Sequence, residues 1–404
     1  MAPMCVIIRA GQRPLVWRGA TRNALRDRLG VALRPLLACG LAVLLAVFLS
    51  GCGSMPFGGR AGEKRCAFIG FTDFSTFSRS AGVSNGETVL LSPVIKAPIK
   101  WNELIVSWNV PLGVHLKAEA RALYRQRATG YYTMGLWSDD PERFPRASVR
   151  RQRDADGAVR TDTLILSNAT RAVQVRITLG GADASCPLKF LGLSFCNSAV
   201  PAPDEKPNRA AWGKVLDVPE RRQGEYEGGG GWCSPTSLSM VLAYWSEQLH
   251  RPELNHSVPE TAHAIADGER ADTGNWPFNT AYAGQFPGMR AYVTRLGGIA
   301  ELEDWIAAGV PVVISVSSYL ASGRTSGPDN GHLIVCVGFT NTGDVVVNDP
   351  GVSVRRNVRA RRVFARANVA KAWSKSKNAV YLIYPESAKV PANRLGHWYG
   401  GVAE

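Results

Sequence analysis

Residues 228–245, with the sequence GGGGWCSPTSLSMVLAYW, join a run of glycines to an apolar segment of helical periodicity. Pro235 suits the first turn of a helix, where its missing N–H costs nothing. Apolar residues then recur at i, i+3, i+4 and i+7, the spacing of the buried side of an amphipathic helix: Leu238, Val241, Leu242 and Trp245. The pattern predicts a helix that begins near Cys233, directly after a glycine backbone that another chain can approach closely.

The position of Cys233 at a helix N-terminus favours the thiolate form of its side chain. The helix dipole contributes at most ~2 kcal/mol, which corresponds to about 1.5 pKa units. From an ordinary pKa of ~8.5, this effect alone leaves the thiol only partly ionised at pH 7. A fully activated cysteine nucleophile therefore needs a cationic histidine as well.

The candidate for that histidine is His332, at the start of the apolar run GHLIVCVGF (residues 331–339). A turn signal, TNTG, and a second run, DVVVNDP (residues 344–350), follow, so the segment predicts a β-hairpin. Positions opposite His332 fall around 350–352, and a small bulge would align it with Asp349. A carboxylate there accepts a hydrogen bond from the imidazole and fixes its tautomer.

Together these motifs resemble a papain-like cysteine peptidase of the bacteriocin-leader-processing (double-glycine) type, in its stand-alone secreted branch. The resemblance covers about residues 212–385 and rests on the Cys-x-Pro-Thr-Ser helix start, the Gly-His before an apolar strand and the closing Asn-Asp-Pro. It implies that Cys233 is the nucleophile, His332 the base and Asp349 the orienting carboxylate. It also implies a glutamine that helps form the oxyanion hole. Gln223 is the nearest candidate, although it lies ten residues before Cys233 rather than the usual five or six; the glycine run can loop out the excess.

The part of the chain before this segment is predicted to be an all-β sandwich or jelly-roll domain, over residues 65–200. Turn clusters separate apolar and β-branched runs of strand length: Thr88–Ile95, Glu103–Val110, Tyr131–Trp137, Thr163–Leu166, Ala172–Leu179 and Phe190–Cys196. A proline-rich linker over residues 201–211 then leads to the α+β papain-like domain, residues 212–386, and a C-terminal tail, residues 387–404. The resemblance likewise implies an accompanying β-rich domain.

Residues 1–51 are predicted to be a lipoprotein signal peptide, followed by a tether over residues 52–64. The apolar run 35–50 spans about 24 Å as a helix, short of the ~30 Å hydrocarbon core, so it fits a signal peptide better than a membrane span. The sequence LSGC (residues 49–52) resembles a lipobox, which makes Cys52 the expected lipidation site; an ordinary signal peptide followed by cysteine is the alternative. Translation that starts near Val31 would leave a leader of conventional length. We therefore expect a protein of the bacterial cell envelope, lipid-anchored outside the inner membrane.

In an oxidising compartment, cysteines that have no other role are expected to form disulfides. Cys336 lies inside the apolar hairpin strand and is predicted to be core. Of Cys66, Cys186 and Cys196, either the last two pair with each other or Cys66 pairs with one of them. We expect one bridge and one free thiol.

Composition limits the other classes of function. The 404 residues are 45% hydrophobic and 20% charged, which excludes a disordered chain and a polytopic membrane protein. Seven arginines and one aspartate in residues 1–51 account for +6 of the net charge of +14, which leaves a modest +8 elsewhere. The basic stretch 355–377 fits a solvated surface or phospholipid contact better than nucleic acid. No zinc or EF-hand spacing is present, so we expect no metal and no cofactor.

The predicted activity is that of an exported cysteine hydrolase that cleaves peptide or amide bonds through a thioester. The same groups serve peptidases, cell-wall amidases and transpeptidases, so the substrate is a peptide, a protein or a cell-wall peptide, acted on by a monomer. The alternative is a non-catalytic lipoprotein that binds peptide or glycan and carries a degenerate peptidase domain. The displaced Gln223 favours that alternative, whereas the complete set of Cys233, His332 and Asp349 argues against it.

Overall fold

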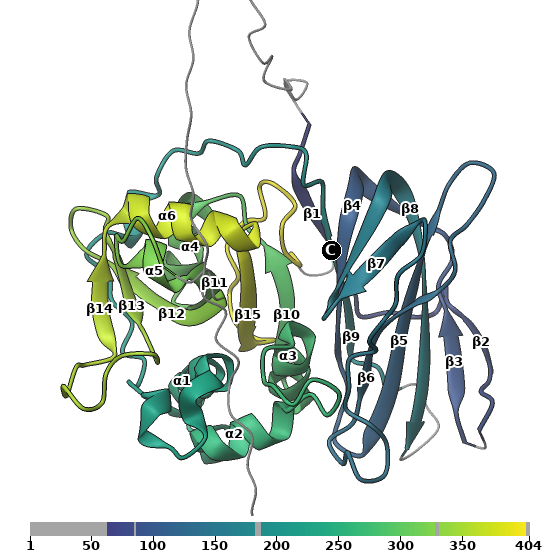
Figure 1. The fold of residues 1–404 in the computed structure, drawn as a ribbon, viewed down its shortest axis with the longest axis horizontal. Helices are drawn as coiled ribbons and strands as arrows, with labels where there is room; N and C mark the ends of the chain where they lie inside the picture. The colour runs from purple at the N-terminus through teal and green to yellow at the C-terminus, as the bar shows by residue number, and fades with distance from the viewer. Residues whose placement is uncertain (1–62, 85, 182–186, 328–330, 401–404) are drawn as a thin grey trace, which may run out of the picture. The chain divides into compact units, whose positions relative to one another are not determined.

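The computed structural model describes residues 63–84, 86–181, 187–327 and 331–400 (Figure 1). All of them belong to one compact unit, Phe57–Glu404. The predicted signal peptide, its lipidation site Cys52 and the cysteine at position 186 lie outside the described residues. None of the helices that the structure describes combines the length and the apolar character needed to cross a membrane.

The first part of the fold, here called the β-rich region (residues 66–196), is a hydrogen-bonded network of antiparallel strands. Its strands are β1 (Cys66–Phe71), β2 (Ser78–Ala81), β3 (Thr88–Leu91), β4 (Ile95–Asn109), β5 (Val114–Leu123), β6 (Tyr132–Trp137), β7 (Gly157–Arg160), β8 (Thr163–Gly181) and β9 (Phe190–Cys196). The main order is β1-β9-β4-β8-β3-β2, and β8 also pairs with β5 and β7. The predicted β-rich character is confirmed, while the sandwich topology stays a prediction.

The strands are longer and more numerous than the sequence runs indicated. Strand β8 joins two predicted runs into one strand, and β4 extends well before the predicted one. Strand β5, with the sequence VHLKAEARAL, was not predicted because alanine, leucine, lysine and glutamate favour helices. Its alternate side chains are nevertheless wholly buried, from Leu116 to Ala122, so burial on one face of a sheet overrides local propensity.

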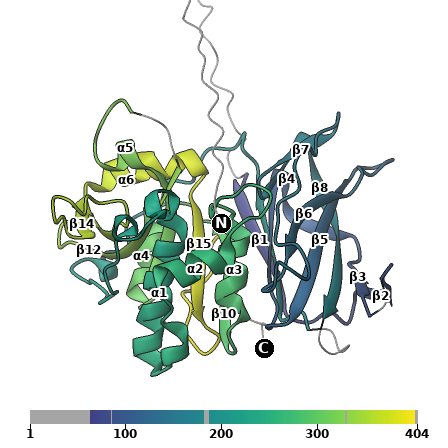
Figure 2. The same ribbon diagram turned by 60° about the horizontal axis from the view of Figure 1, so that its bottom comes forward.

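The second part, here called the α+β region (residues 209–385), has a six-stranded antiparallel sheet in the order β10-β15-β11-β12-β13-β14. Its strands are β10 (Met289–Arg295), β11 (Val312–Ser317), β12 (Gly331–Phe339), β13 (Val345–Asn348), β14 (Arg361–Phe364) and β15 (Ala379–Pro385). Its helices are α1 (Cys233–Leu249), α2 (Val258–Ile265), α3 (Trp276–Gln285), α4 (Ile299–Ala307), α5 (Ser318–Ala321) and α6 (Arg366–Trp373). Figure 2 shows α1, α2 and α3 side by side; α1 contacts β12, while α3 packs on β10.

Helix α1 differs from the amphipathic helix that the sequence predicts. Every residue from Ser234 to Ser246 is buried, including the positions expected to face solvent. Two of its small polar side chains donate to backbone carbonyls, Ser237 to Leu333 O at 3.0 Å and Ser239 to Thr236 O at 2.8 Å. The helix that begins at Cys233 is therefore held on all sides.

The two regions share one continuous hydrophobic core. At their junction, the side chain of Asn109 at the end of β4 bonds the backbone of Ala291 on β10 through both its amide nitrogen, at 2.7 Å, and its oxygen, at 3.2 Å. Residues after β15 also join the regions: Phe68 N donates to Gly396 O at 2.8 Å, and Trp398 is 1% exposed. The segment predicted as a C-terminal tail is thus packed against the fold as far as residue 400.

Candidate active site

Cys233 is the first residue of α1, and its half-buried side chain is hydrogen-bonded to His332. Trp232 occupies the N-cap position and offers no side-chain hydrogen bond, so the first N–H groups of the helix have no side-chain cap. The backbone N–H groups of Ser234 and Leu333 also favour the charged form of this sulfur. The surroundings of the thiol therefore stabilise a thiolate.

These groups act against the effect of burial on the thiol. Burial by itself raises the pKa of Cys233, because a thiolate loses its hydration there. The hydrogen bond and positive charge of His332 lower this pKa, and so do the two backbone N–H groups. The balance leaves the pKa of Cys233 below its ordinary value, which favours the nucleophilic thiolate.

Strands β12 and β13 form the hairpin that positions the histidine. A bulge between Cys336 and Gly338 shifts their pairing by one residue. Continued toward the open end of the hairpin, the shifted pairing places His332 opposite Gly351. The side chain of Asp349 spans the remaining offset: its Oδ1 lies 2.7 Å from His332 Nε2. Because Nε2 is engaged there, Nδ1 is the ring nitrogen left for the thiol.

The ionisation of His332 and Asp349 is coupled through this contact. Burial opposes a charge on the imidazole, but hydrogen bonds to Asp349 and Cys233 outweigh it and raise the pKa of His332 to about 10. Burial likewise raises the pKa of Asp349, yet the bond to His332, the N–H of Gly351 and the charge of Arg362 bring it below its ordinary value. The residues thus favour a thiolate, an imidazolium and a carboxylate at neutral pH.

Two serines of α1 fix the helix start against the rest of the site. Ser237 Oγ donates to Leu333 O, one residue after the histidine, at 3.0 Å. Ser234 Oγ lies 2.8 Å from Asn279 Oδ1 and 2.9 Å from the hydroxyl of Tyr381. Sequence reasoning missed both serines. The one sequence feature that pointed to them was the number of small polar residues on α1, a helix that is buried on all sides.

Gly351 is a second residue that sequence reasoning missed. Its N–H donates to Asp349 Oδ1 at 2.9 Å, so it helps hold the carboxylate. A Cβ at this position would lie 2.9 Å from His332 Cε1 and 3.2 Å from Nε2. Only a glycine backbone lets the chain pass this close to the imidazole without moving the ring.

Gln223 lies at the same site, and its side-chain amide is already hydrogen-bonded. It lines a cavity of about 350 Å³ together with His332 and Asp349. Its Nε2 donates to Gly230 O at 2.9 Å, and its own N–H donates to Pro350 O at 3.0 Å. The additional residues before the nucleophile fold into two short 3-10 turns, Gln223–Glu225 and Gly229–Gly231. The side chain is close to the candidate triad but is tied to the glycine run rather than free.

Cys336 is separate from this chemistry. It is wholly buried on β12, and burial raises the pKa of its thiol to about 12. Among the described residues, no group of three or more histidine, cysteine, aspartate or glutamate side chains is arranged to hold a metal ion. The reactive groups that the site offers are therefore a thiol, an imidazole, a carboxylate and backbone N–H donors, a set suited to acyl transfer.

Comparisons with known families agree with this chemistry. Residues 215–381 match the family described as Peptidase_C39 like family, and residues 83–194 match the one described as Peptidase C39 N-terminal domain. No curated protein matches the chain. The first match contains the candidate triad, and the second falls within the β-rich region.

Proposed function

The chain is a cysteine peptidase of the Peptidase C39 family with the family's N-terminal domain, and on this basis we propose that Cys233, His332 and Asp349 hydrolyse peptide bonds through a thioester. Cys233 is the nucleophile, His332 the acid and base, and Asp349 the group that orients the imidazole. The observation that carries the proposal is the pair of contacts made by one ring, to the thiol of Cys233 and, at 2.7 Å, to the carboxylate of Asp349.

The first half-reaction forms the acyl-enzyme. The thiolate of Cys233 attacks the carbonyl carbon, a C–S bond forms, and the carbonyl oxygen takes up the electron pair. The N–H groups at the start of α1 are donors for this oxyanion, and the second N–H of Gln223 Nε2 is a further one. The C–N bond then breaks as the imidazolium of His332 gives its proton to the leaving nitrogen.

The second half-reaction regenerates the enzyme. Neutral His332 accepts a proton from water, whose oxygen attacks the thioester carbonyl. The C–S bond breaks, the new carboxyl group leaves, and the thiolate of Cys233 is restored beside a protonated His332. The raised pKa of His332 and the lowered pKa of Cys233 favour this resting state.

We further propose that the protein works outside the inner membrane, as a monomer anchored by a lipid on Cys52, and that its β-rich region is a sandwich. The lipobox-like sequence and the short apolar run before it support the anchor. The substrates are then peptides, proteins or cell-wall peptides of the envelope. Acyl mass on Cys52 in the detergent phase supports the anchor, and a soluble chain with an unmodified N-terminus refutes it.

The experiment that tests the chemistry compares Cys233 with Cys233→Ser and with a free cysteine. Iodoacetamide at pH 6–7 should alkylate Cys233 faster than a free thiol, and pretreatment should abolish peptide cleavage. The serine variant should keep its fold by circular dichroism and lose cleavage, because serine lacks the low-pKa nucleophile. Undiminished cleavage by the purified serine variant would place the active site elsewhere.

One observation favours a second candidate, a binding protein with a degenerate peptidase site. The Gln223 amide bonds Gly230 O instead of facing an open oxyanion position. If this reading is right, Cys233 reacts with iodoacetamide no faster than a free thiol, and peptide binds without being cleaved.

A further inference from the structure

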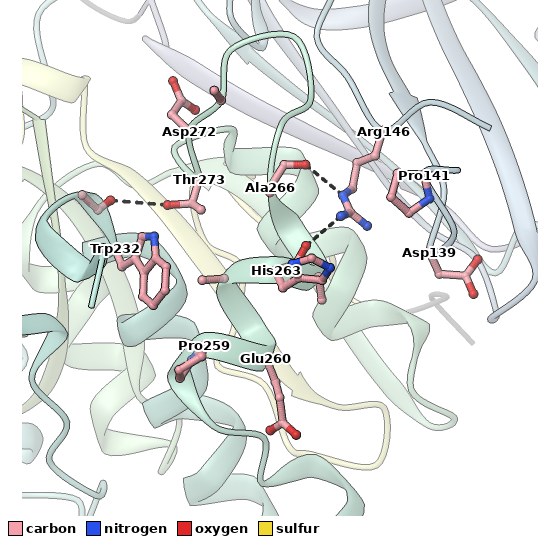
Figure 3. Close-up of a pocket in the computed structure, with 15 residues that line it drawn as sticks. Asp139, Pro141, Arg146, Trp232, Pro259, Glu260, His263, Ala266, Asp272 and Thr273 are labelled. Carbon is pink, nitrogen blue, oxygen red and sulfur yellow. Dashed lines mark hydrogen bonds between the residues drawn. The ribbon is translucent and has the colours of Figure 1, made fainter. Parts of the chain in front are cut away.

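A second and larger cavity lies beside the nucleophile, where the β-rich and α+β regions meet (Figure 3). Its volume is about 1030 Å³, at the top of the ~300–1,000 Å³ range usual for ligand sites. Gly231 and Trp232, the two residues that precede Cys233, line it. On the opposite side, Asp139 and Pro141 of the β-rich region line it as well. The cavity therefore adjoins the backbone directly before the nucleophile.

The wall contributed by the β-rich region is held in place by a buried arginine. Arg146 is 4% exposed, and its Nε and Nη2 donate to Ala266 O at 2.9 Å and to His263 O at 2.7 Å. Figure 3 shows these two bonds at the end of α2. Its Nη1 donates to Ser138 O at 3.1 Å, next to Asp139. The guanidinium is thus occupied by carbonyl oxygens and serves to fasten the loop rather than to meet a ligand.

The charges left at the cavity are predominantly negative. Asp139, Glu260 and Asp272 contribute carboxylates, and Asp272 is paired with Arg270 at 2.9 Å. The Glu260 side chain is 64% exposed, and Asp139 is exposed too. Their other contacts are local: Asp139 accepts a hydrogen bond from Gly113 N, while Glu260 closes the capping box of α2 and lies 3.9 Å from His256 Nδ1. Both carboxylates can therefore meet a cation.

The cavity also offers apolar surface and an open approach. Trp232, Pro141 and Pro259 line it, which suits the aliphatic stem of a long basic side chain. Cβ positions at Gly230 and Gly231 have no atom within 4 Å, so the backbone toward Cys233 is open to a bound chain. By contrast, the smaller cavity at His332 is lined by Arg324 and Arg362. The two cavities thus differ in the sign of their charge.

We propose that the larger cavity is a substrate subsite that binds the peptide on one side of the scissile bond and selects a lysine or arginine there. The β-rich region supplies one of its walls, and Asp139 and Glu260 are specificity-determining residues. This inference rests on the proposed peptidase function and adds to it a class of substrate: peptides with a basic residue within a few positions of the cleaved bond, always on the same side.

The test uses variants of the purified chain that remove charge and keep hydrogen bonds. Asp139→Asn retains an acceptor for Gly113 N, and Glu260→Gln retains the capping box. Glu142→Gln, an exposed carboxylate from the same loop outside the cavity lining, is the matched control. A chymotryptic peptide mixture, read by mass spectrometry, gives the cleavage profile. Matched fluorogenic peptides that differ by one Lys/Glu exchange then give kcat and KM.

The expected profile has lysine and arginine enriched on one side of the cleaved bonds. Each cavity variant should lower kcat/KM for the lysine peptide about twofold to fivefold, mainly through KM and less at high salt, while Glu142→Gln stays at the wild-type value. A flat profile, or an unchanged lysine-to-glutamate ratio in an active double variant, would overturn the subsite and leave the peptidase function intact.

Failure of the peptidase function itself has a different signature. In that case no peptide is cleaved and Cys233 is as slow toward iodoacetamide as a free thiol. The subsite is then tested by binding alone: fluorescence anisotropy measures the affinity of a labelled lysine peptide for the Cys233→Ala variant, which cannot cleave it. Weaker peptide binding in Asp139→Asn and Glu260→Gln, but not in Glu142→Gln, supports the subsite. Equal peptide binding in the wild type and all three variants refutes it.

Discussion

The hydroxyl of Ser237 on α1 donates a 3.0 Å hydrogen bond to the carbonyl oxygen of Leu333 on β12. The first residue of this bond lies one helical turn after Cys233, and the second directly follows His332. One side chain thus links the helix that carries the thiol to the strand that carries the imidazole. The relative placement of nucleophile and base depends on a contact that takes no part in the chemistry.

Replacing Ser237 with alanine should therefore affect both stability and turnover. Loss of the bond leaves a buried carbonyl without its side-chain partner, so the free energy of unfolding should fall by about 1–2 kcal/mol in urea titrations. The rate of iodoacetamide reaction at Cys233 should fall as well. Ser239→Ala is the control, because its hydroxyl bonds within α1. Equal loss of thiol reactivity in both variants would refute a positioning role for Ser237.

The pH dependence of peptide cleavage should be bell-shaped, with limbs set by Cys233 and His332. On the acid side, activity is lost as the thiolate is protonated, at a pH below the ordinary thiol pKa because that pKa is lowered. On the alkaline side, activity is lost near pH 10 as His332 releases its proton. Asp349→Asn removes the carboxylate that favours the imidazolium, so the alkaline limb should move down by about 1–3 pH units. A limb that stays near 10 in this variant would mean that Asp349 does not control the ionisation of His332.

Gly351→Ala should impair catalysis without preventing folding. The new methyl group would lie 2.9 Å from His332 Cε1, closer than side-chain carbons normally approach, so the ring or the Asp349 loop must move. We expect kcat to fall at least about tenfold, since a displacement of ~1 Å at a catalytic group costs up to a hundredfold. Gly230→Ala is the comparison, because its Cβ meets no atom within 4 Å. Wild-type kcat in Gly351→Ala would show that the ring tolerates the added carbon.

Cys66 and Cys196 should form a disulfide in an oxidising medium. They face each other across β1 and β9, with their sulfur atoms 3.6 Å apart. Both side chains are buried in the folded chain, so the bridge should close while the protein folds in oxidised glutathione: one thiolate attacks the glutathione disulfide, and the other cysteine then displaces glutathione. The bridge should add about 2–4 kcal/mol to the free energy of unfolding. Peptide mapping that finds both cysteines reduced after this treatment would contradict the prediction.

The part of the site that could be predicted from the sequence is the part built from neighbouring residues. The helix start at Cys233 and the hairpin that joins His332 to Asp349 follow from periodicity and turn signals over short stretches. A small bulge is one way to align His332 with Asp349; the bulge between Cys336 and Gly338 leaves His332 opposite Gly351, and the Asp349 side chain spans the rest. Local patterns carry this information since the partners are few residues apart.

The contacts that complete the site connect distant parts of the chain, so no periodicity or turn signal in the sequence indicates them. Ser237 meets the carbonyl of Leu333, 96 positions away, and Arg146 reaches the carbonyl of His263, 117 positions away. Nothing in the residues around either donor specifies its acceptor. The β5 strand shows the same limit, because its helix-favouring composition is overridden by neighbours that the sequence does not place beside it.

The packing of residues 396–399 has a consequence for how the protein is made. Phe68 in the first strand bonds Gly396, and Thr72 lies 3.3 Å from the hydroxyl of Tyr399, 327 positions later. In the same segment, His397 meets the wholly buried carboxylate of Glu301 at 2.7 Å. During synthesis from the N-terminus, β1 therefore gains its strand partner β9 about halfway along the chain, whereas the contacts of Phe68 and Thr72 with residues 396–399 form only when the last residues have been made.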